Sequence, residues 1–412
     1  MTRTDESELM APSSAERLPI MDSRQRTRIH SLLLAWYAGE GRHYLPWRQT
    51  RDPYAILVAE IMLQQTQVER VLPKYTSFLD RFPTIEALAE SPTAEVIRAW
   101  SGLGYNLRAV RLQEIARQVS ERYDGRLPST LEELLSLKGV GRYTAGAVAC
   151  FAFELPVATV DTNIRRVLWR VFRGIEPPLW PTGVRGGREL LSLAEWALPV
   201  DTYNWQQALM DLGATTCLSR RPLCERCPLA DSCQAYAETS RMTLFPSGDA
   251  LARFRDERRN SYENDAVGDG GAEGPSLPQA ASATVKTGRA VAEQAPLYTG
   301  TAASPQGLHS LQSPQKTVKR RSSEPFTQTS RYFRGRVVEI LRGLAPDESL
   351  TLAELGPLVR SDFGADTPGH SAWLAEILRG LARDGLVRIL DTGAPPETGG
   401  DAVWSRIRIG LP

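Results

Sequence analysis

Residues 137–146 read LKGVGRYTAG, and they contain the most informative turn of the sequence. The turn Gly139-Val140-Gly141 joins two segments whose apolar residues recur at helical spacing. Glycine permits left-handed backbone and close approach, so the amides of the turn and of the following helix point outward at a phosphate. A lone Gly-x-Gly is also common in tight helical turns, but here an acidic residue, Asp161, follows downstream. The stretch therefore predicts a helical hairpin that contacts phosphate.

Around this hairpin, apolar residues keep helical spacing from about residue 24 to residue 236. Turn signals such as Phe82-Pro83 and Asp124-Gly125 separate the segments. No convincing run alternates between apolar and polar residues, as a half-buried strand would. The sequence therefore predicts an all-α module over residues 24–245.

The flanking regions have a different composition. Residues 1–23 are polar and are expected to form a disordered tail. Between Arg255 and Pro325 there is no Ile, Met, Trp, Phe or Cys. Such a stretch cannot bury enough apolar surface to offset its chain entropy, so residues 246–327 are expected to be a disordered linker.

Order is expected to return in residues 328–412. Three helical segments precede two strand-like segments, 386–390 and 403–409, which is the order of a small α+β winged helix-turn-helix. Its third helix, at about 370–384, would be the recognition helix. Residues 316–342 carry eight Lys or Arg against two Glu, which favours DNA contact. A protein-interaction domain of the same fold is the alternative.

Composition limits the class of protein. The 412 residues suggest two or three domains, and 49 basic against 48 acidic residues leave a net charge of +1. Nucleic-acid binding by bulk charge is thereby excluded, and local basic patches would have to supply it. No apolar run approaches a membrane span, and the N-terminus lacks the apolar core of a signal peptide. We expect a soluble, cytoplasmic monomer without membrane contact.

Four of the five cysteines are clustered. Cys217, Cys224, Cys227 and Cys233 are separated by six, two and five residues. Four thiolates hold either a tetrahedral zinc ion or a 4Fe–4S cluster. Zinc sites more often pair two Cys-x-x-Cys hairpins, so the single one here favours the iron–sulfur cluster, with zinc or unligated thiols as alternatives.

The remaining residues of this region have simpler interpretations. Cys150 lies in an apolar run and is expected in the core. Arg220 and Arg221, in the first loop between cysteines, are expected at the surface beside the cluster. They either contact phosphate or belong to a solvated loop.

Six motifs in order make the chain recognisable. They are Leu45-Pro46-Trp47-Arg48, Glu60 to Val68, Gly102-Leu103-Gly104-Tyr105, the hairpin, Val160-Asp161-Thr162-Asn163, and the four cysteines. Together they resemble the helix-hairpin-helix DNA glycosylases with an iron–sulfur cluster, and among these the adenine DNA glycosylases. The resemblance covers about residues 24–236. It implies two helical lobes that bind double-stranded DNA with a mismatched or oxidised base pair, and hence association with the nucleoid.

Hydrolysis of an N-glycosidic bond needs an acid for the leaving base and a carboxylate near the cationic sugar. The resemblance assigns the first role to Glu60, which would protonate N7 of adenine. It assigns the second to Asp161, with Asn163 orienting that carboxylate. An ordinary surface carboxylate is the alternative for Glu60, and helix capping is the alternative for Asp161.

Tyr143 separates two classes of glycosylase. In relatives similar to endonuclease III, a lysine at this hairpin position forms a Schiff base and then cleaves the strand. Tyrosine cannot do so, and Lys138 occupies another position of the hairpin. The chain is therefore expected to be monofunctional and to leave an abasic site, with Tyr143 assisting Asp161. A packed aromatic is the alternative for Tyr143.

Other contacts are implied only by the resemblance. The residues expected to contact DNA or the base are Trp47, Gln64, Gln65, Leu103, Tyr105, Gly139, Gly141, Gln207, Arg220 and Arg221. Gln65 and Tyr105, with Leu103 adjacent, match residues that wedge into the duplex beside the extruded base. Trp47 and Gln207 match positions that line the adenine pocket. The sequence departs from the family at His43, where Arg or Lys is frequent, and at Thr162, where Gly is usual.

Three functions follow from these motifs. The first is removal of adenine opposite 8-oxoguanine or G, although the β-rich domain similar to Nudix hydrolases, which reads 8-oxoguanine in this family, is not found in the sequence. The second is removal of thymine or uracil opposite G, which Gln64-Gln65-Thr66-Gln67 disfavours because the thymine enzymes tend to be basic there. The third is a DNA-binding regulator with a disabled glycosylase fold. The presence of Glu60, Tyr143 and Asp161 argues against it.

Overall fold

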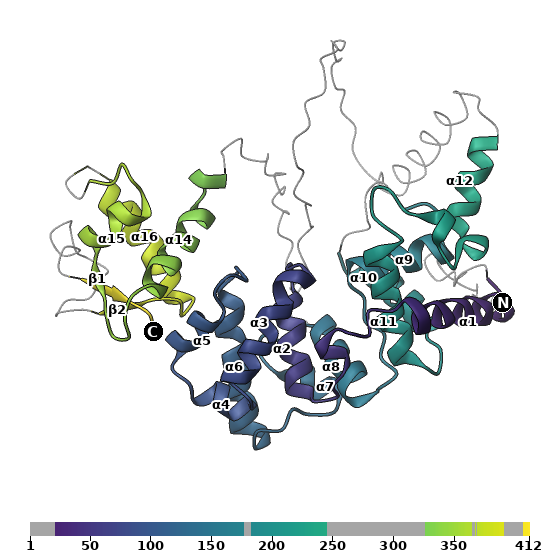
Figure 1. Ribbon diagram of the computed structural model, residues 1–412, viewed down its shortest axis with the longest axis horizontal. Helices are drawn as coiled ribbons and strands as arrows, with labels where there is room; N and C mark the ends of the chain where they lie inside the picture. Colours follow the sequence, from purple (N-terminus) through teal and green to yellow (C-terminus); the bar gives the residue numbers. More distant parts are fainter. Residues whose placement is uncertain (1–20, 177–182, 245–325, 365–366, 368, 391–406) are drawn as a thin grey trace, which may run out of the picture. The chain divides into compact units, whose positions relative to one another are not determined.

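The computed structural model forms two compact units (Figure 1). Its described residues are 21–176, 183–244, 326–364, 367, 369–390 and 407–412. The first unit contains residues 1–42 and 156–298, and the second contains residues 43–155 and 299–412, each as far as the chain is described. Most of the predicted tail and linker lies outside the described residues. Along the described residues, no helix combines the length and apolarity needed to cross a membrane.

The first unit is helical wherever it is described. Its elements are α1 (Ser23–Glu40), α9 (Thr162–Phe172), α10 (Gly183–Trp196), α11 (Thr202–Thr215), α12 (Gln234–Leu244) and the 3-10 turns η2 (Cys224–Arg226) and η3 (Ala230–Ser232). A capping box starts α1, because Asp22 accepts the N–H of Gln25 at 2.8 Å while the side chain of Gln25 accepts the N–H of Asp22 at 3.2 Å. The buried face of α1 shares its apolar core with α9 and α11.

Residues 43–155 of the second unit form what we call the helical lobe. Its elements are η1 (Pro46–Arg48), α2 (Pro53–Leu63), α3 (Val68–Arg81), α4 (Ile85–Glu90), α5 (Thr93–Ala99), α6 (Leu107–Tyr123), α7 (Leu131–Ser136) and α8 (Arg142–Phe153). Every α2 residue from Tyr54 to Met62 is buried. This helix packs against α3, α6 and α8 and is therefore central to the lobe.

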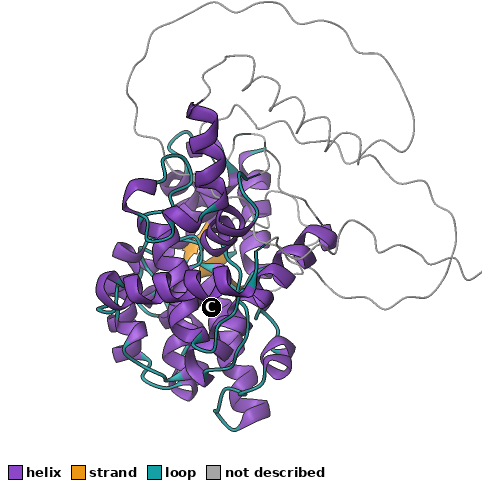
Figure 2. Cartoon of the chain, turned by 90° about the vertical axis from the view of Figure 1, so that its right-hand side faces the viewer, coloured by secondary structure: helices purple, strands orange, loops and turns teal. Residues whose placement is uncertain are grey.

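Residues 326–412 of the second unit form what we call the C-terminal domain. Its elements are η4 (Phe326–Gln328), α14 (Ser330–Arg342), β1 (Leu350–Thr351), α15 (Leu352–Val359), α16 (His370–Arg383), β2 (Arg388–Leu390) and β3 (Arg408–Gly410). The three strands form an antiparallel sheet in the order β1-β3-β2. Figure 2 shows these strands, in orange, as one small group. On β3, Ile409 stands opposite both Leu350 and Ile389.

The structure confirms the predicted fold class, a helical protein with a small α+β domain. It differs at β1, a strand of two residues that carries too short a pattern to be read from sequence. The predicted recognition helix corresponds to α16, which buries one face in the domain. Ser371, Leu374, Ala375, Ile377, Leu378 and Leu381 of this helix are all buried.

Candidate functional site

Glu60 lies in the middle of α2 and is 7% exposed. The helix starts at Pro53 because Asp52 caps its first turn and proline is compatible with that position. From there the sequence is apolar on every side, so α2 is buried all round rather than along one stripe. The interpretation of Glu60 as an ordinary surface carboxylate is therefore wrong.

Arg108 on α6 connects the end of α2 to the turn that precedes α6. Its guanidinium donates to the carbonyl oxygens of Ile61 and Met62, each at 2.9 Å, and to that of Gln64. It also donates to Thr66 Oγ1 at 2.9 Å. On the other side, the same guanidinium donates to the carbonyl oxygens of Leu103 at 3.2 Å and Gly104 at 3.3 Å.

Nothing in the sequence alone marks Arg108 as a residue of this site. Its side chain is 7% exposed, and burial lowers its pKa to about 10. A buried cation without a carboxylate partner is stabilised here by carbonyl oxygens, as buried charges require hydrogen bonds. An arginine three residues after Tyr105 was the available signal, but only the folded backbone shows which acceptors it reaches.

The two residues predicted to wedge into DNA both lie in left-handed backbone. Gln65 has φ of 54° and Tyr105 has φ of 45°. Both are exposed, and Tyr105 is 45% exposed despite its size. Leu103, expected beside them, is 2% exposed and supports the turn from inside the lobe.

The turn before Tyr105 depends on two glycines. Gly102 has φ of 86° and Gly104 has φ of 72°, values that residues with a side chain rarely adopt. The carbonyl of Gly104 also accepts the indole N–H of Trp100 at 3.1 Å. The Gly-x-Gly-Tyr motif thus builds a tight turn that holds an aromatic side chain in solvent.

Gln64 and Trp47 lie within the same lobe. The amide of Gln64 donates to Thr144 Oγ1 at 3.4 Å, which ties the end of α2 to α8. Trp47, in η1, is 7% exposed and packs edge-to-face on Tyr75, with ring centroids 5.3 Å apart. These contacts hold both side chains in defined positions.

The predicted hairpin is formed by α7, a turn and α8. Gly139 has φ of 99°, in the left-handed region that favours glycine. Gln118 on α6 binds the backbone of the turn through two hydrogen bonds. Its side chain accepts the N–H of Lys138 at 2.8 Å and donates to the Lys138 carbonyl at 3.1 Å. The N-cap of α8 is Gly141, which supplies no side-chain cap to the first-turn amides. Tyr143 is half-buried in that first turn.

Asp161, in the first unit, is the N-cap of α9. Its carboxylate accepts the N–H of Ile164 at 2.6 Å. Burial raises the pKa of this carboxyl, although the backbone N–H groups of Ile164 and Asn163 and the nearby Arg166 act in the opposite direction. Capping, the alternative from sequence, is therefore present, and the same carboxyl has its pKa raised by burial.

Asn163 holds α9 close to α11. Its side-chain oxygen accepts a hydrogen bond from Arg166 at 2.9 Å, and Arg166 also donates to the Gly213 carbonyl. A Cβ on Gly213 would lie 2.7 Å from Asn163 Cβ, so only glycine fits there. The backbone N–H of Asn163 acts on the Asp161 carboxylate, and orientation of that carboxylate by the Asn163 side chain stays a prediction.

The other predicted residues of the first unit divide by exposure. Gln207 on α11 is 4% exposed, whereas Arg220 and Arg221 are exposed on the loop between the first two clustered cysteines. The exposed loop agrees with both interpretations made from sequence.

The four clustered cysteines are unpaired and partly buried. Among the described residues, no three or more His, Cys, Asp or Glu side chains are placed to hold a single metal ion. The four thiols nevertheless lie near enough to influence one another. Burial, together with the other cysteines of the cluster, raises the pKa of Cys227 to about 12 and that of Cys233 to about 11.

Such thiols become ligands only when positive charge compensates them. One guanidinium nitrogen of Arg170 lies 3.5 Å from Cys217 Sγ, and the same side chain donates to the carbonyl oxygens of Leu218 at 2.7 Å and Ser219 at 2.9 Å. Four thiols with an adjacent arginine fit an iron–sulfur cluster, whose core and thiolates together carry negative charge.

Each unit thus gathers part of the predicted site. The second unit holds Glu60, Gln64, Gln65, Trp47, Leu103, Tyr105, Gly139, Gly141 and Tyr143. The first unit holds Asp161, Asn163, Gln207, Arg220, Arg221 and the four cysteines.

Two family models match the chain. "HhH-GPD superfamily base excision DNA repair protein" matches residues 58–178. "Iron-sulfur binding domain of endonuclease III" matches residues 217–233, which begin and end at clustered cysteines. The second match confirms the predicted iron–sulfur cofactor.

Curated relatives define the family more narrowly. The adenine DNA glycosylase of Mycolicibacterium smegmatis is 45% identical over 226 residues, which are 54% of this chain and 73% of that protein. The chain belongs to the adenine DNA glycosylase family. The adenine DNA glycosylase of Mus musculus is 42% identical over 247 residues, 58% of this chain and 47% of that protein. That of Buchnera aphidicola subsp. Baizongia pistaciae is 38% identical over 214 residues, 50% of this chain and 58% of that protein.

The chain spans about half the length of these last two relatives. Among solved structures, a thermostable thymine-DNA glycosylase is 35% identical and covers 52% of this chain and 98% of its own, with a TM-score of 0.48.

Proposed function

We propose that this chain is a monofunctional DNA glycosylase that extrudes adenine from a mispair with 8-oxoguanine or G and hydrolyses its N-glycosidic bond. The observation that carries the proposal is the buried Glu60 on α2, in a chain of the adenine DNA glycosylase family. A buried, apolar setting favours the protonated carboxylic acid, which is the form that donates a proton to a leaving base.

Glu60 gives its proton to N7 of adenine, so that the base leaves as a neutral molecule. The sugar then carries positive charge, and the carboxylate of Asp161 stabilises it electrostatically. Water adds to the sugar carbon and gives up a proton to the ionised Glu60 carboxylate, so an abasic site remains and the acid is restored. Desolvation of Asp161 strengthens this stabilisation, because a charge interacts more strongly in a low-dielectric site.

Tyr143, in the first turn of α8, has no amine and so forms no Schiff base. It assists Asp161, and the strand stays intact until alkali or a second enzyme cleaves it. Asn163 orients the start of α9, on which Asp161 stands.

DNA is held by elements that present backbone amides or polar side chains. The uncapped first turn of α8, with Gly139 and Gly141 before it, contacts phosphate. Gln65 and Tyr105 fill the space that the extruded base leaves. Trp47, Gln64 and Gln207 contact the base, and Arg220 and Arg221 contact the backbone beside the cysteine cluster.

Cys217, Cys224, Cys227 and Cys233 hold the 4Fe–4S cluster. When bound, the cluster fixes the loop of residues 217–233, which contains little regular structure of its own. The protein acts as a monomer on chromosomal DNA in the cytoplasm.

The test is base excision from duplexes that hold A opposite 8-oxoguanine, A opposite G, or T opposite G, each with and without alkali. Breaks at A that need alkali support the proposal. Excision of T alone would establish the thymine enzyme instead, and breaks without alkali would refute monofunctional chemistry.

The matched variants are Glu60→Gln and Glu121→Gln, the latter exposed on α6. Glu60→Gln should lose excision by on the order of 10²–10⁴-fold, since general acid catalysis contributes that much, while DNA affinity is kept. Glu121→Gln should behave as the wild type. Equal excision by all three proteins would refute the role of Glu60, whereas no excision by any of them would favour a DNA-binding protein without catalysis.

A further inference from the structure

The C-terminal domain shares an apolar core with the helical lobe. Ile97 on α5 is 0% exposed and belongs to the same cluster of buried side chains as Val338 and Leu341 of α14. Leu107 and Val110 of α6 pack against this cluster too. The domain is therefore docked on the corner that α5 and α6 form, rather than tethered beside it.

Hydrogen bonds reinforce this contact. Arg342, at the end of α14, donates from Nε to the carbonyl oxygen of Ile97 at 3.0 Å. One of its terminal nitrogens donates to Asn106 Oδ1 at 2.7 Å, and the side chain is only 7% exposed. The N–H of Ala94, in the first turn of α5, donates to the Pro412 carbonyl at 2.9 Å.

The docking site adjoins the turn that presents Tyr105. Asn106, the acceptor for Arg342, is the residue after Tyr105 and the N-cap of α6. At the other end of α14, the guanidinium carbon of Arg331 lies 4.4 Å from the centre of the Tyr105 ring. A cation over an aromatic face at this distance is attracted by the ring electrons.

Other cations surround the same turn. Arg70 on α3 donates to the Gly102 carbonyl. Lys74, one helical turn along α3, brings its Cε within 3.5 Å of where a Cβ on Gly102 would stand. With Arg331, three positive side chains from two separate parts of the sequence meet at one exposed turn.

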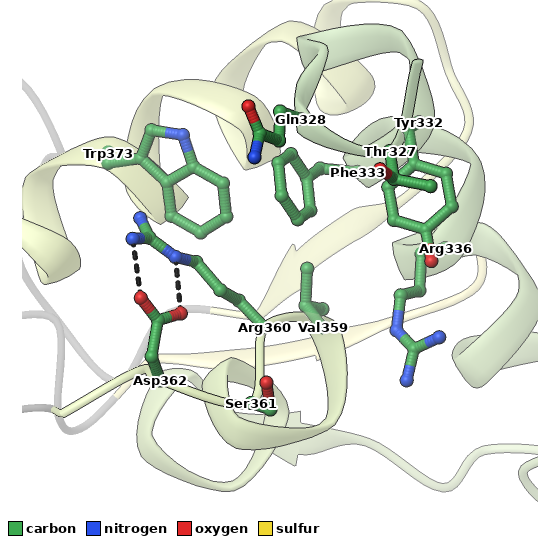
Figure 3. A pocket seen from close by; sticks show the side chains of 10 residues that line it. All are labelled: Thr327, Gln328, Tyr332, Phe333, Arg336, Val359, Arg360, Ser361, Asp362 and Trp373. Atoms are coloured by element: carbon green, nitrogen blue, oxygen red, sulfur yellow. Dashed lines mark hydrogen bonds and ion pairs between the residues drawn. The ribbon is translucent and has the colours of Figure 1, made fainter. Parts of the chain in front are cut away.

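The next residues of α14 face elsewhere. Tyr332, Phe333 and Arg336 line a pocket of about 590 Å³ within the C-terminal domain (Figure 3). In that pocket Arg360 is already paired with Asp362, at 2.6 and 2.7 Å. Tyr332, Phe333 and Arg336 thus face this pocket, whereas Arg331 places its positive charge at the Tyr105 turn.

The helix expected to read DNA is a weaker candidate. On α16 the exposed positions are Ala372, Glu376, Arg379 and Arg383, so an acid stands among the two arginines. Most of its remaining surface is in the core of the domain.

We propose that the C-terminal domain forms part of the DNA-binding surface of the helical lobe, with Arg331 binding a DNA phosphate beside Tyr105. This inference rests on the proposed function only in taking DNA as the ligand. Docking through Arg342 fixes where Arg331 stands. The domain thereby adds a phosphate contact to the DNA-binding surface at the point where Tyr105 enters the duplex.

The first test compares Arg331→Ala with Arg383→Ala in the full chain, by measuring affinity for a plain duplex at several salt concentrations. Each phosphate contact contributes about 0.9 to the slope of log affinity against log salt. Arg331→Ala should lower that slope by about one contact, whereas Arg383→Ala should leave it unchanged. An unchanged slope for Arg331→Ala would overturn the proposal, because Arg331 would then be a solvated side chain without a phosphate contact. A lower slope for Arg383→Ala alone would also overturn it and would place the phosphate contact on α16.

The second test examines docking. Asn106→Ala removes the acceptor of Arg342 from the lobe without removing a helix cap, since the Asn106 side chain makes no capping bond. Amide hydrogen exchange in residues 93–107 should become faster, and Arg331→Ala should then lower the salt slope by less than it does in the wild-type background. Unchanged exchange together with full additivity of the two substitutions would overturn the docking.

Both tests use an undamaged duplex and need no turnover. If the wild type excises no base from any duplex, the proposed function fails while a lost salt slope in Arg331→Ala still supports this inference. If the wild type excises adenine and the slope is unchanged in Arg331→Ala, only this inference fails.

Discussion

The two units hold their proposed catalytic carboxylates by different means. Glu60 lies in the middle of α2, where every helix residue from Tyr54 to Met62 is buried. Asp161 lies at the first turn of α9, where backbone N–H groups bind its carboxylate directly. Packing favours an uncharged acid, whereas hydrogen bonds from N–H groups favour a carboxylate. For Asp161, burial outweighs these N–H groups and raises the pKa of the carboxyl, so the two sites differ in how their carboxyl groups are held rather than in the direction in which burial acts.

The largest expected effect separates capping from catalysis at Asp161. Asparagine caps a helix about as well as aspartate, so Asp161→Asn should keep the fold, with a change in unfolding free energy within about 0.5 kcal/mol. The charge that stabilises the sugar is lost, so single-turnover excision should fall on the order of 10²–10³-fold. Chemical denaturation and quench-flow excision measure the two quantities. Unchanged excision would leave capping as the only role of Asp161.

In the second unit, where α2 is buried, Arg108→Met should lower the free energy of unfolding by about 3 kcal/mol. The substitution leaves buried carbonyl oxygens of α2 and of the Gly102–Tyr105 turn without a donor, and each such loss costs about 1–3 kcal/mol. Urea denaturation measures the change. Arg111→Met, one exposed residue on the same helix, is the control and should stay near the wild type. Equal stability of the two variants would contradict the role of Arg108.

A smaller effect is expected where α9 meets α11. The Cβ of alanine at position 213 would stand 2.7 Å from Asn163 Cβ and 3.2 Å from Asn163 Cα, so the start of α9 must shift. Gly213→Ala should cost about 1–3 kcal/mol of stability and slow excision, because Asp161 moves with α9. Gly187→Ala, on α10 with no atom near its added Cβ, is the control and should be neutral or slightly stabilising. Thermal unfolding and excision rates compare the two.

The smallest effect concerns pH. Burial raises the pKa of Asp161, so the carboxylate takes up a proton at a higher pH than an ordinary aspartate, whose pKa is about 3.9. Excision should therefore decline as the pH falls through this raised value, and Asp161→Asn should lack that decline. The same shift means that ionised Asp161 costs stability above its folded pKa, so Asp161→Asn should be no less stable than the wild type at neutral pH. A wild-type rate that stays flat down to about pH 4 would contradict the desolvation of this group.

Residues that act through local sequence were predictable. Gly139 and the Gly102–Tyr105 turn adopt the left-handed backbone that their glycines allow, and the apolar run around Glu60 produces the buried helix expected. The spacing of the cysteines likewise agrees with the iron–sulfur family model.

Residues that act through distant contacts were not predictable. Arg108 looks like any helical arginine until the end of α2 is folded against it, and Arg342 reaches acceptors more than 200 residues away in sequence. Leu103 and Tyr105 lie in one motif, yet only the folded turn shows that the first is buried and the second exposed. The strand β1 exists because β3 pairs with it.

The guanidinium of Arg108 links two backbone segments of the lobe that the proposed reaction uses. It bonds to the carbonyl oxygen of Ile61, next to the proposed acid, and to those of Leu103 and Gly104, next to the proposed wedge. The backbone beside the proposed acid and the backbone beside the proposed wedge therefore share one buried donor, and loss of that donor would leave acceptors unpaired at both places at once.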